Sequence, residues 1–311
     1  MVLRPAFLWL SERQDLFNFI KKNGLARKFA SRFVAGETVD SAIDVAKDLN
    51  AAGIAVSLDL LGESVHDATE AARARDEVLA LLERVPETGG DTNVSVKLTQ
   101  MGLDVSLKVC EENIRAVLES ARKKGIFVRL DMESSAYTQR TLDLFNERLH
   151  SEFGHGVGVV IQSYMRRSAS DIEQLIASQA RVRLCKGAYA EPPELAFQER
   201  SEVTESFAKL MQQLMERGSY PGIATHDEEL IDRTVAFVLA QGIPADRFEF
   251  QMLYGVRRDL QRSLRKRGYN MRVYVPFGTQ WYPYLMRRLA ERPANLAFMT
   301  MSVLKETFSG K

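Results

Sequence analysis

The sequence is poor in the residues that build disulfide and metal sites. Among its 311 residues are two cysteines and four histidines. Cys110 and Cys185 lie far apart and belong to no Cys-x-x-Cys pattern, and no His-x-His or two-His-one-carboxylate spacing is visible. This composition argues against a disulfide framework, a zinc site and metal catalysis, and it fits a reducing compartment.

Long hydrophobic runs and an excess of one charge are missing as well. The formal net charge is +1, which argues against a nucleic-acid partner. The N-terminal apolar run Ala6–Leu10 is too short for a signal-peptide core or a membrane span, and no later stretch approaches that length. The expected location is the cytoplasm, with peripheral contact at the inner face of the cytoplasmic membrane as an alternative.

Eight short apolar runs of strand character recur along the chain. Their starts are separated by roughly 23 to 40 residues, the spacing of repeated strand–helix units. The runs are Ile54–Leu58, Val94–Leu98, Phe127–Leu130, Val157–Ile161, Val182–Cys185, Gly222–Ala224, Phe248–Met252 and Met271–Val275.

Amphipathic helical patterns lie between these runs. Clear examples are Ser64–Leu82, Ser106–Lys123, a helix from Pro192 to Gly218, and one that begins at Asp227. Apolar strands alternating with helices predict a parallel sheet. Eight units without a Gly-rich phosphate fingerprint or a linker favour an α/β fold of the closed (β/α)8 barrel type over a doubly wound sheet.

The predicted barrel covers residues 51–311, and residues 1–50 differ from it. Three helical patterns, Glu12–Lys22, Leu25–Phe33 and Thr38–Leu49, predict an N-terminal helical arm. Such an arm could pack on the barrel or on a neighbouring subunit, so a homo-oligomer is one of the expected possibilities.

Polar residues stand where each predicted strand ends. In barrels of this type the active site forms at those ends. An isolated polar residue inside a barrel often only pairs with another, but convergence from all eight strands is hard to explain without a ligand. The groups are Asp59, Lys97, Asp131 with Glu133, Gln162, Arg183 with Lys186, Thr225 with His226, Gln251, and Tyr274.

Two of these groups, Lys97 and Asp131, follow consecutive strands at similar depth. They are predicted to form an ion pair that keeps the lysine charged at the barrel mouth.

Two adjacent arginines, Arg287 and Arg288, occupy a predicted helix after the last strand. Neighbouring guanidiniums repel unless an anion lies between them, because neither loses its proton. An exposed basic corner is the alternative, but the position directly after an apolar strand favours an anion clamp. With Lys97, Arg183 and Lys186 at the same mouth, these residues predict a barrel enzyme that binds a small carboxylate. They do not establish redox chemistry.

Seven ordered motifs, spread from about residue 50 to residue 300, resemble those of the flavin-dependent proline dehydrogenases. The resemblance is to the short bacterial form with a single activity. The motifs are Val-Ser-Val-Lys97-Leu, Val-Arg-Leu-Asp131-Met-Glu, Val-Ile-Gln162-Ser-Tyr, Val-Arg183-Leu-Cys-Lys186-Gly-Ala-Tyr189, Ala-Thr225-His226, Phe-Gln251-Met-Leu253-Tyr-Gly, and Tyr274…Tyr284-Leu-Met-Arg287-Arg288-Leu-Ala-Glu291.

The resemblance implies a FAD-dependent oxidation of L-proline to Δ1-pyrroline-5-carboxylate, the first step of proline catabolism. A hydride would pass from the ring carbon beside nitrogen to flavin N5, and a quinone would take the electrons. The implied catalytic residues are Asp131, in contact with Lys97, and Arg183, near flavin N5, where a positive charge stabilises the reduced flavin.

The resemblance also assigns binding residues by matching positions. Those expected around proline are Lys97, Tyr274, Tyr284, Arg287, Arg288, Glu291 and Leu253. Those expected around FAD are Met132, Gln162, Arg183, Lys186, Gly187, Ala188, Thr225 and His226. Asp227 departs from the bifunctional relatives, which carry Asn there.

Two other functions stay open at this point. Strand-end lysines in barrels often form Schiff bases, so Lys97 or Lys186 could serve a lyase or aldolase. A barrel that only senses proline, or docks to a membrane enzyme, is the non-catalytic alternative.

Overall fold

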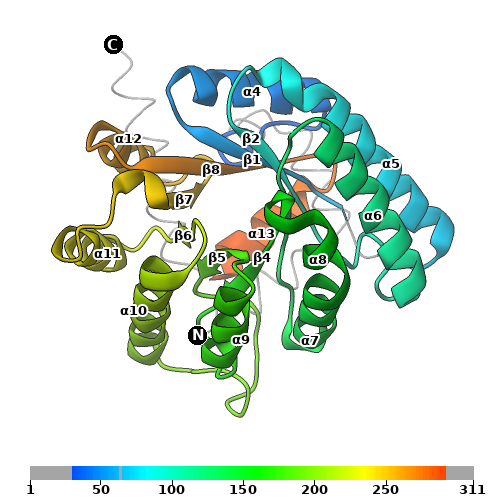
Figure 1. Cartoon of the computed structure of the whole chain (residues 1–311). Coiled ribbons are helices and arrows are strands. Elements are labelled where there is room, and N and C mark those ends of the chain that lie inside the picture. Colours follow the sequence, from blue (N-terminus) through cyan, green and yellow to red (C-terminus); the bar gives the residue numbers. More distant parts are fainter. Residues whose placement is uncertain (1–29, 63–64, 292–311) are drawn as a thin grey trace.

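Eight parallel strands close into a barrel in chain order, from β1 beside β2 round to β8 beside β1 (Figure 1). The computed structural model describes the backbone of residues 30–62 and 65–291 and side chains as far as residue 286. The strands are β1 Ala55–Leu60, β2 Thr92–Val96, β3 Val128–Leu130, β4 Val157–Gln162, β5 Arg181–Cys185, β6 Gly222–Ala224, β7 Glu249–Leu253 and β8 Asn270–Phe277. The predicted barrel and its eight strands are confirmed, with ends that differ by one or two residues.

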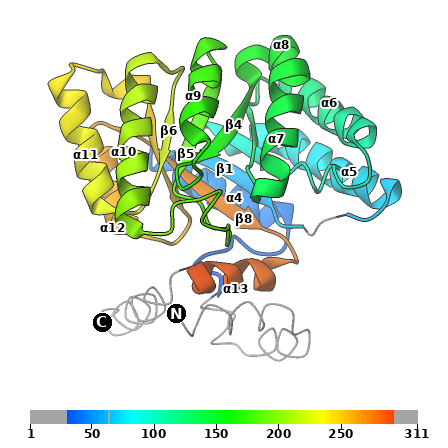
Figure 2. The same cartoon turned by 90° about the horizontal axis from the view of Figure 1, so that it is seen from below.

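Helices surround the barrel and cover the outer face of the sheet (Figures 1 and 2). They are α4 Val39–Ala51, α5 Ala68–Arg84, α6 Leu107–Lys123, α7 Ser135–Leu144, α8 His150–Phe153, α9 Ser168–Ala177, α10 Arg200–Arg217, α11 Glu228–Ala240 and α12 Arg258–Lys266. The last helix, α13 Trp281–Glu291, does not belong to this outer layer (Figure 2). Short segments of 3-10 or π type lie at Val85–Thr88, Phe145–Leu149, Gly154–Gly156 and Ala245–Arg247. No helix in the described ranges has the length and apolar character to span a membrane.

Helix α6 illustrates how local sequence sets these elements. Ser106 caps it by accepting a hydrogen bond from the Val109 N–H, and its apolar stripe, including Ile114 and Val117, is buried. Gly125, at φ +67°, follows the end of the helix. Sequence and structure agree here because capping and amphipathic period point to the same boundaries.

The helix predicted from Pro192 was placed too early, since α10 begins at Arg200. The Pro192 carbonyl accepts the N–H groups of Leu195 and Ala196, which forms a turn, and Ala196 then bridges to Met165. Hydrogen bonds to the neighbouring loop therefore replace the first two turns of the expected helix. Helix α5 likewise begins four residues late, because Asp67 caps it through the N–H groups of residues 69 and 70.

Helix α13 lies across the end of the barrel where the strands finish (Figure 2). Its first turns pack on residues that precede α4, and the Trp281 indole donates to Glu37 at 3.0 Å. The apolar cluster at this contact comprises Ala30, Phe33, Val34, Leu61, Trp281, Tyr282, Tyr284, Leu285 and Met286.

The three arm helices have different outcomes. The predicted helix at Thr38–Leu49 is confirmed as α4. Glu12–Lys22 lies outside the described residues, and so does most of Leu25–Phe33. The division into arm and barrel stays a proposal.

Candidate active site

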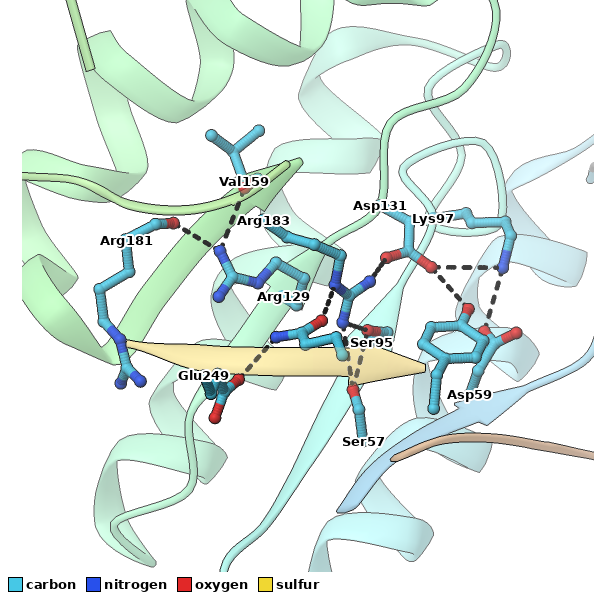
Figure 3. Close-up of polar contacts among 12 residues, drawn as sticks. Ser57, Asp59, Ser95, Lys97, Arg129, Asp131, Val159, Arg181, Arg183 and Glu249 are labelled. Atoms are coloured by element: carbon cyan, nitrogen blue, oxygen red, sulfur yellow. Dashed lines mark hydrogen bonds and ion pairs between the residues drawn. The ribbon is translucent and has the colours of Figure 1, made fainter. Parts of the chain in front are cut away.

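Asp131 is the centre of a hydrogen-bonded cluster at the carboxyl end of the strands (Figure 3). One carboxylate oxygen accepts from Arg183 Nη1 at 2.8 Å, and the other accepts from the Tyr274 hydroxyl at 2.7 Å. Lys97 Nζ lies 3.8 Å from the second oxygen. Groups following β2 and β3 therefore meet groups on β5 and β8. The structure adds Arg183 and Tyr274 to the pair of Lys97 and Asp131 that the sequence predicted.

Lys97 has a nearer partner than the one predicted for it. Its Nζ lies 3.0 Å from Oδ1 of Asp59, a residue of β1 that is fully buried. Burial opposes the charge on Lys97, but Asp59 and Asp131 together outweigh that effect and raise its pKa. Lys97 is thus held as a cation, which favours carboxylate binding and disfavours a Schiff-base nucleophile, since that role needs a neutral amine.

Arg183 is a buried cation with every side of its guanidinium engaged. Nε donates to Gln251 at 2.5 Å, and Nη2 donates to Ser95 and Ser57 at 3.2 and 3.4 Å. The Tyr274 ring lies 5.2 Å below the guanidinium carbon. These contacts fix the position of the positive charge, and Asp131 balances it across the barrel.

Asp59 and Gln251 were recognised as strand-end polar residues but were not included among the site residues. The alternation of side chains along a strand could have identified Gln251. Glu249, Gln251 and Leu253 are two residues apart along β7, so they face the barrel interior together. Gln251 connects the site to deeper groups, since its amide donates to Glu249 at 2.6 Å.

The residues expected around the cofactor follow β3, β4, β5 and β6, beside the Asp131 cluster. Lys186 lies 2.7 Å from Asp227 and 3.2 Å from the Thr204 hydroxyl. Arg200 approaches the same carboxylate at 3.4 Å and is mostly exposed. Two cations around one carboxylate leave a net positive charge here, as a phosphate-bearing ligand requires.

His226 is held in a defined state by the backbone of β7. Its Nε2 lies 2.9 Å from the Leu253 N–H. Because that nitrogen accepts a hydrogen bond, it carries no proton, and Nδ1 carries the proton of the neutral ring. His226 therefore presents a hydrogen-bond donor at Nδ1.

Further polar groups mark the same edge of the barrel. The Gln162 amide donates to the Glu133 carbonyl at 2.7 Å, and the Thr225 hydroxyl accepts the Asp227 N–H at 3.1 Å. Ser163 Oγ is buried and has no hydrogen-bond partner among the described residues. Such an orphaned group favours a bound polar molecule at this edge, and the donor set fits the flavin dinucleotide that the resemblance implies.

The remaining predicted residues divide by how far the structure describes them. Met132 and Tyr284 are buried, Leu253 ends β7, and Ala188 follows β5. Arg287, Arg288 and Glu291 lie in α13, but their side chains are outside the described part. No group of three or more His, Cys, Asp or Glu side chains suited to a metal ion occurs within the described ranges.

Gly187 occupies a position that no larger residue fits. Its φ is +106°, and a Cβ there would lie 2.2 Å from the Tyr164 ring. For the flavin that the resemblance implies, we expect Gly187→Ala to reduce the flavin-to-protein absorbance ratio of the purified protein several-fold, since the loop must shift and strain of about 1–3 kcal/mol is added. Gly89→Ala is the matched control, because Gly89 has φ +69° but open space around its Cβ position. Equal flavin content in both variants would exclude a role for this loop in cofactor binding.

Comparison with known proteins identifies the family. The chain matches the family model described as proline dehydrogenase over residues 42–301. It is 39% identical over 306 residues to proline dehydrogenase 2 of Bacillus subtilis, with 98% of this chain and 100% of the relative covered. It is 40% identical over 310 residues to the proline dehydrogenase of Deinococcus radiodurans, with 97% and 98% covered.

A solved structure has the same fold. The crystal structure of proline utilization A from Bdellovibrio bacteriovorus inactivated by N-propargylglycine has a TM-score of 0.80 and 28% identity, covering 88% of this chain and 33% of that chain.

Proposed function

The chain belongs to the proline dehydrogenase family, and we propose that it uses FAD as the hydride acceptor and a quinone as the final electron acceptor. This flavin-dependent family oxidises L-proline to Δ1-pyrroline-5-carboxylate. The observation that carries this proposal is the Asp131 cluster, which places a lysine, an arginine and a tyrosine around one carboxylate. A quinone acceptor also favours peripheral contact with the membrane.

The proline carboxylate is assigned to cations on the substrate side. Lys97, kept charged by Asp59 and Asp131, lies at the mouth, and Arg287 and Arg288 supply a bidentate clamp from α13. Glu291 is assigned to balance that clamp. Two guanidiniums and one ammonium fix both the position and the orientation of the carboxylate, which hydride transfer requires.

Apolar and aromatic side chains are assigned to the carbon side of the pyrrolidine ring. Tyr274 is held by its hydrogen bond to Asp131, while Tyr284 is buried at the start of α13. Together with Leu253 they would exclude water from the reacting carbon.

The cofactor is assigned to the edge formed by the ends of β3 to β6. When bound, FAD supplies the acceptor for the hydride that leaves the ring carbon beside nitrogen. Arg183 contributes a fixed positive charge next to that acceptor. The other residues assigned to hold FAD are Met132, Gln162, Lys186, Gly187, Ala188, Thr225 and His226.

The direct test is an absorption spectrum recorded under anaerobic conditions before and after addition of L-proline. Loss of the visible flavin band is the expected result. A colourless protein that borohydride labels in the presence of a carbonyl substrate would instead establish a lyase. A flavin band that L-proline leaves unchanged would establish a barrel that binds without catalysis.

The clamp can be tested by removing one guanidinium at a time. We expect Arg287→Met or Arg288→Met to raise the KM for proline at least about tenfold, because each substitution removes a charge-assisted hydrogen bond to the carboxylate. Steady-state kinetics at saturating quinone analogue measures the change. Arg262→Met, on the exposed side of α12, is the control and should leave KM unchanged. An unchanged KM in both clamp variants would remove the clamp from the mechanism.

A further inference from the structure

A cavity lies at the opposite end of the barrel from the Asp131 cluster. Its volume is about 340 Å³, which lies within the range of small-molecule sites, roughly 300–1,000 Å³. Its walls come from the residues that begin β2, β3, β5 and β8 and from the turn before β6, among them Asn93, Phe127, Arg181, Tyr220 and Arg272. The Asp131 cluster stands at the finishing ends of the same strands, so the two sites are distinct.

Three guanidiniums gather at this end, and only one of them has carboxylate partners. Arg272 is fully buried and pairs with Glu249 at 2.8 Å and with Asp91 at 2.7 Å. Arg129 and Arg181 form no ion pair with any described residue. Two carboxylates therefore face three permanent cations, and because guanidinium stays protonated, a positive charge is left uncompensated.

Arg181 lies on the wall of the cavity and is held there by two aromatic rings. Its guanidinium carbon is 4.3 Å from the Phe127 ring centre and 4.8 Å from that of Tyr220. Cation–π contacts orient the guanidinium plane but do not neutralise its charge. Its Nε is buried and has no hydrogen-bond partner among the described residues.

Arg129 lies next to Arg181, since both guanidiniums contact the Phe127 ring, and it adds a second positive charge near the cavity. It is 1% exposed, and it donates to the main-chain carbonyls of Val159 and Arg181 (Figure 3). Carbonyl dipoles alone seldom compensate a buried charge. Burial, and after it the nearby Arg183 and Arg181, lower its pKa, while the Glu249 carboxylate opposes them.

The cavity wall also contains an unmatched amide. Asn93 is 4% exposed, and its Oδ1 has no hydrogen-bond partner in the described structure. Water could solvate this atom and the Arg181 Nε, but water cannot balance the charge of the guanidiniums. An anion that also carries a hydroxyl, or a hydrated anion, would supply a donor to Asn93 Oδ1, an acceptor to Arg181 Nε and a negative charge beside the guanidiniums.

We propose that this cavity binds a small oxyanion, a phosphate or a carboxylate, with the Arg181 guanidinium as its principal partner. Oxyanions match the fork of donors on guanidinium. The inference does not rest on the proposed function. The residues of the cavity make no direct contact with Asp131, and the hydrogen-bonded connection between the two sites runs from Arg272 through Glu249 and Gln251 to Arg183. Loss of proline oxidation would leave it standing, and loss of anion binding would leave the proposed function standing.

Titration of the purified holo-protein with sodium phosphate and, separately, with sodium succinate tests the proposal. Thermal unfolding and isothermal calorimetry are recorded against sodium chloride at the same ionic strength. A saturable increase in Tm with either probe, absent with chloride, is expected. Whichever probe binds more tightly identifies the source of the oxyanion. Increases no larger than those in chloride for both probes would overturn the proposal.

Arg181→Met should weaken the binding of the better probe at least about tenfold, as expected for loss of a charged hydrogen-bond donor. Arg267→Met is a matched control, because Arg267 stacks on Tyr269 at 5.4 Å but lies outside the cavity. It should bind the probe as the wild type does. Wild-type affinity in Arg181→Met would overturn the proposal.

A second variant keeps the test decisive if Arg181→Met does not fold. Asn93→Asp puts a carboxylate on the same wall, so it should supply the missing negative charge and repel an oxyanion. The expected result is at least tenfold weaker probe binding with unchanged or higher Tm in the absence of probe. Undiminished binding in this variant would contradict an oxyanion at the cavity.

Discussion

Asp131→Ala is expected to lower kcat/KM for proline by about a hundredfold or more. The substitution removes the carboxylate that faces Arg183 at 2.8 Å and the Tyr274 hydroxyl at 2.7 Å. Breaking a buried ion pair by removing one partner costs about 3–5 kcal/mol, and each 1.4 kcal/mol of lost transition-state stabilisation is a factor of ten. Steady-state kinetics with a quinone analogue measures the loss.

Two further variants separate chemistry from stability. Asp131→Asn keeps a hydrogen-bond acceptor for Tyr274 but removes the negative charge, so its kcat/KM for proline should lie between the values of the wild type and Asp131→Ala. Asp171→Asn disrupts the ion pair of another buried carboxylate, that of Asp171 with the partly exposed Arg167 at the start of α9, and should change Tm but not kcat/KM. If Asp131→Ala retained wild-type kcat/KM, the Asp131 cluster would have no part in the reaction.

Arg183→Met is expected to lower the midpoint potential of the bound flavin. A fixed cation next to the flavin favours the reduced form, which carries more negative charge. A charged hydrogen bond worth about 1.5–3 kcal/mol corresponds to roughly 30–60 mV for a two-electron couple. Potentiometric titration measures the shift, and kcat should fall with it.

The control substitution keeps the positive charge of Arg183 but removes a hydrogen bond that holds the guanidinium in position. Gln251→Leu removes the Nε partner of Arg183, which lies at 2.5 Å, without changing the net charge. Its potential should move less than that of Arg183→Met, while kcat falls because the guanidinium is less well positioned. Equal potentials in wild type and Arg183→Met would place this arginine away from the flavin.

Most of the barrel could be predicted because its determinants are local. Buried parallel strands are apolar along most of their length, as in β4, where Val157–Ile161 are apolar or glycine and all six residues of the strand are buried. Helix boundaries followed the caps where a capping side chain was present, as with Ser106 in α6. The start of α10 was not predictable in this way, because a turn at Pro192 and a bridge to Met165 depend on a loop from elsewhere in the chain.

The site was predictable as a set of residue types but not as a set of pairs. Lys97 and Asp131 were expected to pair from their equal depth on neighbouring strands. The closer partner of Lys97 is Asp59, which reaches it from β1. Lys186, assigned to the cofactor, pairs with Asp227 across 41 positions of sequence. Partners so far apart depend on strand register and rotamers, which no local pattern encodes.

What the sequence alone determined is the chain of eight strand–helix units, the polar residues at their ends and the family to which the motifs belong. Apolar period, capping residues and ordered motifs are properties of neighbours in the chain, and they survive without tertiary information. Only the tertiary structure decided which charges neutralise one another. Coulomb interaction and desolvation depend on distances of a few ångströms between residues such as Asp131 and Arg183, which the order and register of the strands bring together. The same arrangement leaves Arg129 and Arg181 without an ion pair to any described carboxylate at the other end of the barrel, and no local pattern in the sequence indicates this.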